Sequence, residues 1–278
     1  MVPRPLTSTT TMNDVVQKVK DINERVYRIL MKASVTCIID EGAKVNTALI
    51  GSKGSSFMFE VDDKRILFNT GRSGRYLIHN MGILGFKADS VDTVIISCPR
   101  IDQIGGLNNF MTNRTVPVDV YAVPEAWDCK RLMGGLISED NIGGVKKQPA
   151  GDDWIRITDH LFLSPSVNGD TKETILVLRT TEGAAVFCAC AESGISDVLA
   201  KVKGKFGVIS TFVGGIRMKK SKQPAVNAIA SEIRDTYGVM RIYLDGCTTA
   251  EGIQKMRIAT ANDKIKDFFV GDVLEFTV

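Results

Sequence analysis

The sequence predicts an α/β protein, an αββα sandwich in which two mixed β-sheets lie between layers of helices, with one more helix at the N-terminus. Short β-rich runs alternate with helical patterns from residue 34 onward. Hairpin signals come early in each half, such as the turn Val61-Asp62-Asp63-Lys64. A glycine-containing stretch, residues 125–153, separates two halves of similar style. Alternating strands and helices with early hairpins are typical of layered α/β proteins.

The chain divides into residues 1–32, a leader with an amphipathic helix, and residues 33–278, a single domain. The apolar positions of the 13–31 helix alternate spacings of four and three and form a narrow seam: Val15, Val19, Ile22, Val26 and Ile29. Two interpretations of this seam stay open. The helix packs on its own domain, or it binds a second copy of the chain or another protein partner.

Composition excludes several classes of protein. The net charge of +3 is small and its lysines and arginines are dispersed, which disfavours a nucleic-acid partner. No apolar run approaches the roughly 20 residues of a membrane span, and residues 1–12 lack the apolar centre of a secretion signal. The six cysteines have no regular spacing, which favours a reduced compartment. We therefore expect a cytoplasmic protein without nucleic-acid or membrane partners.

The first half is expected to alternate strands with two helices. Apolar β-rich runs predict strands at 35–40, 56–61, 65–68, 91–97 and 117–123, and helices are expected at 74–81 and 106–111. Residues 125–153 are expected to form a loop-rich insertion between the two halves, because glycine recurs there among residues of mixed polarity.

The second half is expected to show the same alternation of strands and helices. Strands are predicted at 155–157, 161–164, 174–179, 184–189, 206–212 and 240–244, with helices at 194–202, 223–237 and 250–259. A closing hairpin is expected over 268–276, around a Val-Gly-Asp turn.

The loop at residues 97–106 is the centre of the functional argument. It reads Ser-Cys-Pro-Arg-Ile-Asp-Gln-Ile-Gly-Gly and follows the apolar run 91–96. Polar residues at the carboxyl end of a buried strand are where α/β folds place their chemistry. The closing Gly-Gly would let a helix or turn begin tightly against the strand end.

This loop resembles the metal-binding loop of the metallo-β-lactamase superfamily, Ser-His-x-His-x-Asp-His-x-Gly-Gly. Further segments match the superfamily in order and spacing: Phe68-Asn69-Thr70-Gly71, Leu84-Gly85, Val116-Pro117-Val118 and Val123-Pro124-Glu125-Ala126. Within the superfamily, the chain is most similar to the dihydropterin-ribofuranosylaminobenzene-phosphate synthases. The resemblance runs from residue 34 to the C-terminus and implies a metallo-β-lactamase-like sandwich.

The same resemblance shows that every histidine ligand is replaced. In the loop, Cys98, Arg100 and Gln103 stand where histidines belong, and only Asp102 is kept. In the other three motifs the histidines have become Glu192, Arg217 and Gly246, and neither His79 nor His160 falls on a ligand position. The superfamily binds zinc or iron through these residues, so we expect no metal and no cofactor here.

Three interpretations of the altered site stay open. In the first, Arg100 and Arg217 form internal ion pairs with Asp102 and Glu192 where the metal would lie, because buried charge needs a partner.

In the second, Arg100 and Arg217 face an open cleft and bind an anionic small molecule, since a guanidinium suits phosphate or carboxylate. Arg72, Lys219 and Lys220 would add to that surface.

In the third, Cys98, Cys190 and Cys247 converge with Asp102 on a soft metal or an iron–sulfur cluster.

The sequence thus predicts a pseudoenzyme, a non-hydrolytic binding or scaffolding subunit. The alternative is a metal-independent enzyme for a phosphorylated or pterin-like anionic substrate, with Asp102 or Glu192 as general base. The candidate ligand-pocket residues are Cys98, Arg100, Asp102, Gln103, Glu192, Arg217 and Cys247.

Overall fold

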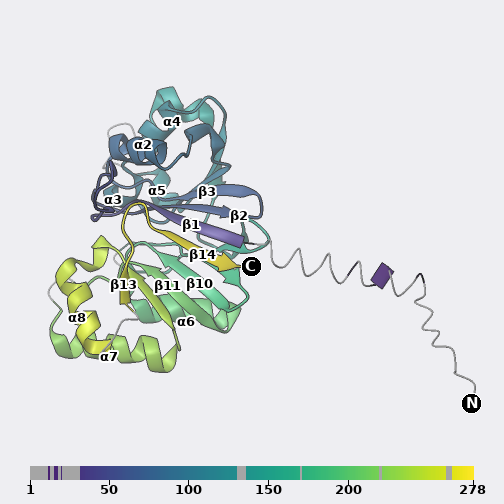
Figure 1. Cartoon of the computed structure of the whole chain (residues 1–278). Coiled ribbons are helices and arrows are strands. Elements are labelled where there is room, and N and C mark those ends of the chain that lie inside the picture. Colours follow the sequence, from purple (N-terminus) through teal and green to yellow (C-terminus); the bar gives the residue numbers. More distant parts are fainter. Residues whose placement is uncertain are drawn as a thin grey trace, which may run out of the picture.

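Two seven-stranded β-sheets face each other in the computed structural model, and helices cover the outer side of each (Figure 1). The structure describes residues 12, 16, 17, 20, 32–129, 136–169, 171–218, 221–260 and 265–278. The predicted αββα sandwich of two mixed sheets flanked by helices is confirmed. The predicted N-terminal helix at 13–31 lies outside the described residues except for positions 16, 17 and 20, and so do Lys219 and Lys220. The division at residue 32 stays a prediction.

The first sheet has the strand order β14-β1-β2-β3-β4-β5-β6. Its strands are β1 (Lys32–Ile39), β2 (Ser56–Val61), β3 (Lys64–Phe68), β4 (Thr93–Ile96), β5 (Val118–Ala122), β6 (Val145–Pro149) and β14 (Val273–Thr277). β2 and β3 form the predicted hairpin, in which Asp62 and Asp63 both adopt positive φ (52° and 57°). This left-handed conformation at both central positions matches the twist of the flanking strands.

The second sheet has the order β13-β12-β11-β10-β9-β8-β7. Its strands are β7 (Ile155–Arg156), β8 (Leu161–Leu163), β9 (Leu176–Thr180), β10 (Gly183–Cys188), β11 (Ile209–Gly214), β12 (Arg241–Leu244) and β13 (Ile265–Asp267). β7 to β10 are antiparallel neighbours, whereas β10 to β13 run parallel. The parallel part therefore brings the carboxyl ends of β10, β11 and β12 to one edge.

Helices form the two outer layers. On the first sheet these are α2 (Gly74–Ile83), η1 (Ala88–Ser90), α3 (Ile101–Ile104), α4 (Leu107–Thr112), α5 (Pro124–Trp127) and η2 (Glu139–Gly144). On the second sheet they are α6 (Ile195–Phe206), α7 (Gln223–Ser231), η3 (Glu232–Thr236), η4 (Gly246–Thr248) and α8 (Ala250–Thr260). Within the described part of the chain, none of the helices has the length and apolar character of a membrane span.

The core lies in three layers. Along β4, Val94 and Ile96 pack under the helices, whereas Ile95 packs between the sheets. This alternation follows from the two-residue period of a strand. Phenylalanines dominate the layer between the sheets, where the rings of Phe59 and Phe187 meet edge-on at 4.7 Å. Each fully buried ring of this kind contributes about 1.5–3 kcal/mol, so this layer holds the two sheets in a fixed relation.

Three predicted elements were wrong in part. The segment 125–153 is not a plain loop, since β6 lies in it and pairs with β5. The strand predicted at 206–212 begins only at Ile209, because α6 continues to Phe206. The closing hairpin does not form. β13 pairs with β12 in the second sheet and β14 with β1 in the first, so the Val-Gly-Asp turn carries the chain between sheets.

Candidate functional site

The loop at 97–106 is fixed to the end of β3 by Asn69. The buried Asn69 side chain accepts a hydrogen bond from the backbone N–H of Ser97 (2.8 Å), and the backbone N–H of Asn69 donates to the carbonyl oxygen of Ile95 (2.7 Å). Asn69 adopts a positive φ of 59°, a left-handed conformation that asparagine tolerates better than most residues. The segment 68–71 and the loop are therefore one structural unit.

The glycine pair closes this unit. A Cβ at Gly105 would lie 2.3 Å from the carbonyl oxygen of Arg72, and one at Gly106 would lie 2.2 Å from that of Thr70. Both distances are much shorter than a van der Waals contact, and the neighbouring atoms belong to the backbone and cannot shift easily. Only glycine therefore fits at these two positions. The tight start expected after the strand is confirmed, since α3 and α4 begin within the loop and directly after it.

A second loop, residues 189–194, follows β10 and faces the first. The buried Glu173 holds it, because its carboxylate accepts hydrogen bonds from the backbone N–H groups of Cys190 (2.9 Å) and Glu192 (3.0 Å). Burial raises the pKa of Glu173, although these N–H groups act in the opposite direction. Ala191 adopts a positive φ of 47° between them. Glu173 was missed in the sequence because it lies outside every recognisable motif.

Glu192 is the centre of the site, and two arginines hold its carboxylate. Its side chain is fully buried. Arg217 donates a hydrogen bond to Oε2 (2.6 Å), and Arg100 Nη1 lies 3.0 Å from Oε1 as an ion pair without hydrogen-bond alignment. Burial alone would lower the pKa of Arg100, but the facing Glu192 carboxylate raises it overall. We call these three residues the Arg–Glu–Arg cluster.

In the first of the three open interpretations, Asp102 shares the two arginines with Glu192. The structure corrects this part of it, because Asp102 pairs instead with Arg72 at 3.4 Å, nearer the surface. The reason is its place on α3, in the first turn after Arg100. One carboxylate therefore lies between the two guanidinium groups of the cluster.

Gln103 has a structural place in the site. It is buried, and its Oε1 accepts a hydrogen bond from Ser55 (2.9 Å) while Nε2 lies 3.9 Å from the sulfur of Cys190. Its backbone oxygen accepts from Thr70 N (2.8 Å). Gln103, which stands at the third histidine position of the superfamily motif, therefore connects the loop at 97–106 with the loop at 189–194.

The structure brings two of the three predicted cysteines into contact. The thiol of Cys247 donates to the sulfur of Cys190 at 2.8 Å. Cys98 is fully buried, and burial, together with Glu173 and Cys190, raises its pKa well above its ordinary value. The pKa of Cys190 is raised too, by its bond with Cys247 and by burial. Thiols with raised pKa values stay protonated at neutral pH, whereas metal ligation needs the thiolate.

The two histidines lie elsewhere. His79 Nε2 is 2.8 Å from the carbonyl oxygen of Ala48, and His160 Nδ1 is 2.7 Å from Asp62 at the β2–β3 turn. Neither contacts the cluster through these bonds, in agreement with the sequence.

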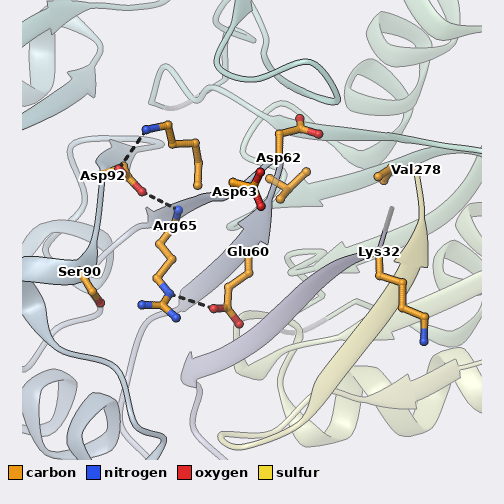
Figure 2. A pocket seen from close by; sticks show the side chains of 10 residues that line it. Lys32, Glu60, Asp62, Asp63, Arg65, Ser90, Asp92 and Val278 are labelled. Atoms are coloured by element: carbon orange, nitrogen blue, oxygen red, sulfur yellow. Dashed lines mark hydrogen bonds and ion pairs between the residues drawn. The ribbon is translucent and has the colours of Figure 1, made fainter. Parts of the chain in front are cut away.

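A separate cavity of about 420 Å³ lies at the amino end of β3, the end opposite the site (Figure 2). Two ion pairs form among its lining residues. Arg65 donates to Glu60 at 2.9 Å, and Lys64 to Asp92 at 3.3 Å. None of the predicted site residues lines it.

The chain has the metallo-β-lactamase fold. It superposes on the crystal structure of Tm1679, described as a metal-dependent hydrolase of the β-lactamase superfamily, with a TM-score of 0.73, 22% identity, and coverage of 88% of this chain and 100% of that one. The metallo-β-lactamase fold protein YhfI from Bacillus subtilis gives a TM-score of 0.60 at 13% identity, covering 88% and 99%.

The sequence is also similar to that of a synthase over most of its length. The 7,8-dihydropterin-6-methyl-4-(beta-D-ribofuranosyl)-aminobenzene-5'-phosphate synthase of Methanocaldococcus jannaschii is 20% identical over 283 residues, covering 86% of this chain and 95% of the relative. No family model matches the chain. The resemblance to the superfamily and to this synthase subgroup, inferred from the motifs, is confirmed.

The residues present do not fit the metal centre that this fold implies. Metal ligands are carboxylates, thiolates and neutral imidazoles. A guanidinium cannot lose its proton in a protein and repels a divalent cation, and two of them lie on Glu192. In the described part of the chain, no group of three or more His, Cys, Asp or Glu side chains is placed to hold a metal ion.

Proposed function

We propose that this chain is a non-hydrolytic binding subunit, a pseudoenzyme, in which the Arg–Glu–Arg cluster has taken the place of the metal centre. One observation carries the proposal. The carboxylate of Glu192 is fully buried between Arg100 and Arg217, and all three stand where the resemblance places histidine ligands. A charged cluster of this kind keeps the two loops in place without a metal. The water activation that metal ions supply in metallohydrolases has no counterpart in it.

The ligand class we propose is a small anion bearing phosphate or carboxylate. Two guanidinium groups lie on the carboxylate of Glu192. Both arginines remain partly exposed, at 31% and 42% of their side chains, so their donors also reach the surface. Arginine suits such anions because its planar donors match their oxygens. The Methanocaldococcus relative, whose name includes a 5'-phosphate, supports the same class.

The geometry favours binding over metal-independent catalysis. Guanidinium groups already engage both oxygens of Glu192, so neither oxygen faces a substrate proton. Asp102, the other proposed general base, is paired with Arg72. A partner role for residues 13–31, in a homo-oligomer or with another protein, stays a prediction on residues outside the described ranges.

Two measurements test the two parts of the proposal. Elemental analysis of protein purified without chelator is expected to find zinc, iron and manganese well below one equivalent. Calorimetric titration with inorganic phosphate is expected to show saturable binding that weakens about tenfold in Arg100→Ala and in Arg217→Ala, the loss of one charge-assisted bond. The matched control is Arg156→Ala, since Arg156 pairs with Asp159 on the surface.

Stoichiometric metal in the purified protein would overturn the pseudoenzyme proposal. Phosphate binding that is equal in the native protein and both cluster variants would instead overturn the anion site alone.

A further inference from the structure

A second cavity, of about 450 Å³, opens beside the cluster and is used by none of the functions above. It lies between the turn after β1 (residues 40–42), the end of β12 (residues 244–246), helix α8 and the segment after β13 (residues 267–269). Its volume is within the range of small-molecule sites. We call it the acidic cavity.

Four carboxylates line the acidic cavity, those of Asp40, Glu41, Asp245 and Asp267. The arginine among its lining residues, Arg257, is hydrogen-bonded to Asp267 at 3.0 Å. Asp40, Glu41 and Asp245 therefore have no cationic partner among the residues that line it. Like charges this close repel one another unless a cation or a proton lies between them.

Asp245 has an unused oxygen in the wall of the cavity. The residue is only 2% exposed, and its Oδ1 accepts a hydrogen bond from the backbone of Cys247 (3.0 Å). Its Oδ2 is buried and has no hydrogen-bond partner in the described part of the chain. A buried polar atom left without a partner costs about 1–3 kcal/mol. A ligand that brings a donor would remove that cost.

Asp40, in contrast, is already hydrogen-bonded. Its carboxylate accepts from the backbones of Gly42 (2.9 Å) and Gly246 (2.8 Å). Burial raises the pKa of Asp40 to about 6, although these bonds oppose the rise, and Glu41 adds to it. The carboxylate is thus ionised at neutral pH and fixed in orientation.

The other side of the cavity is apolar. The ring of Phe269 lies so close over Gly42 that a Cβ there would be 2.3 Å from it. Ile253 of α8 and Leu244 of β12 continue this surface. Carboxylates facing an aromatic wall suit a ligand with a cationic end and a flat or apolar body.

We propose that the acidic cavity binds a small organic cation, whose amidinium, guanidinium or ammonium N–H groups bond to Glu41 and to the unpartnered Oδ2 of Asp245 and whose apolar body packs on Phe269. Such a ligand is opposite in charge to the anion assigned to the cluster, so the inference stands apart from the proposed function. An organic cation also suits the donor set better than a metal ion, since the described residues form no group placed to hold one.

Calorimetric titration of the full chain with benzamidine tests this assignment, with neutral benzamide of nearly the same shape as the paired probe. We expect one benzamidine to bind saturably, at least about tenfold more tightly than benzamide, because charge-assisted hydrogen bonds are the stronger kind. Glu41→Gln removes one carboxylate from an exposed position and is expected to weaken benzamidine about threefold to tenfold. Ala250→Trp, at the exposed start of α8, is expected to block the cavity.

The matched control is Asp63→Asn, which removes a carboxylate from the cavity of Figure 2 and is expected to leave benzamidine binding unchanged. Equal affinity for benzamidine and benzamide would overturn the proposal. Binding that survives both Glu41→Gln and Ala250→Trp unchanged would overturn it as well, by placing the probe elsewhere.

Discussion

Buried carboxylates occur at two adjoining places in this molecule, the Arg–Glu–Arg cluster and the acidic cavity, and they are neutralised in different ways. In the Arg–Glu–Arg cluster, two guanidinium groups balance Glu192. In the acidic cavity, burial raises the pKa values of Asp40 and Asp245, so a proton neutralises each carboxylate only at pH values below its raised pKa. Cys247 joins the two, since its thiol contacts Cys190 and its N–H bonds to Asp245. Balance by arginine persists at every physiological pH, whereas balance by protons does not.

The largest effect is expected from removing the arginines. The double variant Arg100→Ala/Arg217→Ala leaves the buried Glu192 carboxylate without a partner, which costs about 3–5 kcal/mol in comparable buried pairs. Urea denaturation should show this loss in the free energy of unfolding. A loss below about 1 kcal/mol would mean that the cluster is no better balanced than a surface ion pair.

The next effect is a dependence of stability on pH. A carboxyl group with a raised pKa keeps its proton in the folded chain at pH values where the unfolded chain has released it. The free energy of unfolding should therefore fall as the pH rises from about 4 through about 6, the range set by Asp40, and continue to fall above it because of Asp245. Each unit of pKa difference is worth about 1.4 kcal/mol.

Thermal unfolding at pH 5 and pH 8 measures this slope, the change in stability with pH. Asp245→Asn should reduce it and stabilise the chain at pH 8, because Asn keeps the bond from Cys247 and cannot ionise. Asp63→Asn should leave the slope unchanged. A native protein that is more stable at pH 8 than at pH 5 would contradict the proton-balanced view of the acidic cavity.

The smallest effect is expected at the outer ion pair. Arg72 and Asp102 are 54% and 30% exposed in their side chains, and their charges are screened by water. Arg72→Ala should change the free energy of unfolding by no more than about 1 kcal/mol. A loss as large as that of the double variant would show that Asp102 belongs to the cluster after all.

Local patterns predicted most of the fold, and they failed where tertiary context decides. The Asp62-Asp63 turn was predictable because only certain residues accept positive φ at both positions. β6 was missed because Val145–Pro149 is an edge strand rich in lysine and glutamine, whose polar character protects the edge rather than marking a core. The turn at 270–272 looked like a hairpin because the residues of a turn do not indicate whether the next strand pairs in the same sheet or in the other one.

The site was predictable as far as its motifs extend. The places of Arg100, Glu192 and Arg217 followed from the resemblance, and their pairing was one of three open interpretations. The partner of Asp102 was not predictable, because it depends on the direction of a side chain from a short helix. Asp40 and Asp245 were overlooked although each follows directly after a strand. Their shared position at strand ends was the sequence signal that could have marked both residues as part of a site.

The pairing of β14 with β1 also bears on how the chain is made. Lys32 and Thr277, near the two ends of the described domain, are opposite each other in the register of the first sheet. During synthesis, β1 leaves the ribosome before every other strand of the two sheets, and its partner β14 leaves after all of them. Until then β1 presents an open edge to every other nascent chain. Contacts between residues so distant in sequence also slow folding, so the edge of β1 stays open to mispairing until β14 has been made.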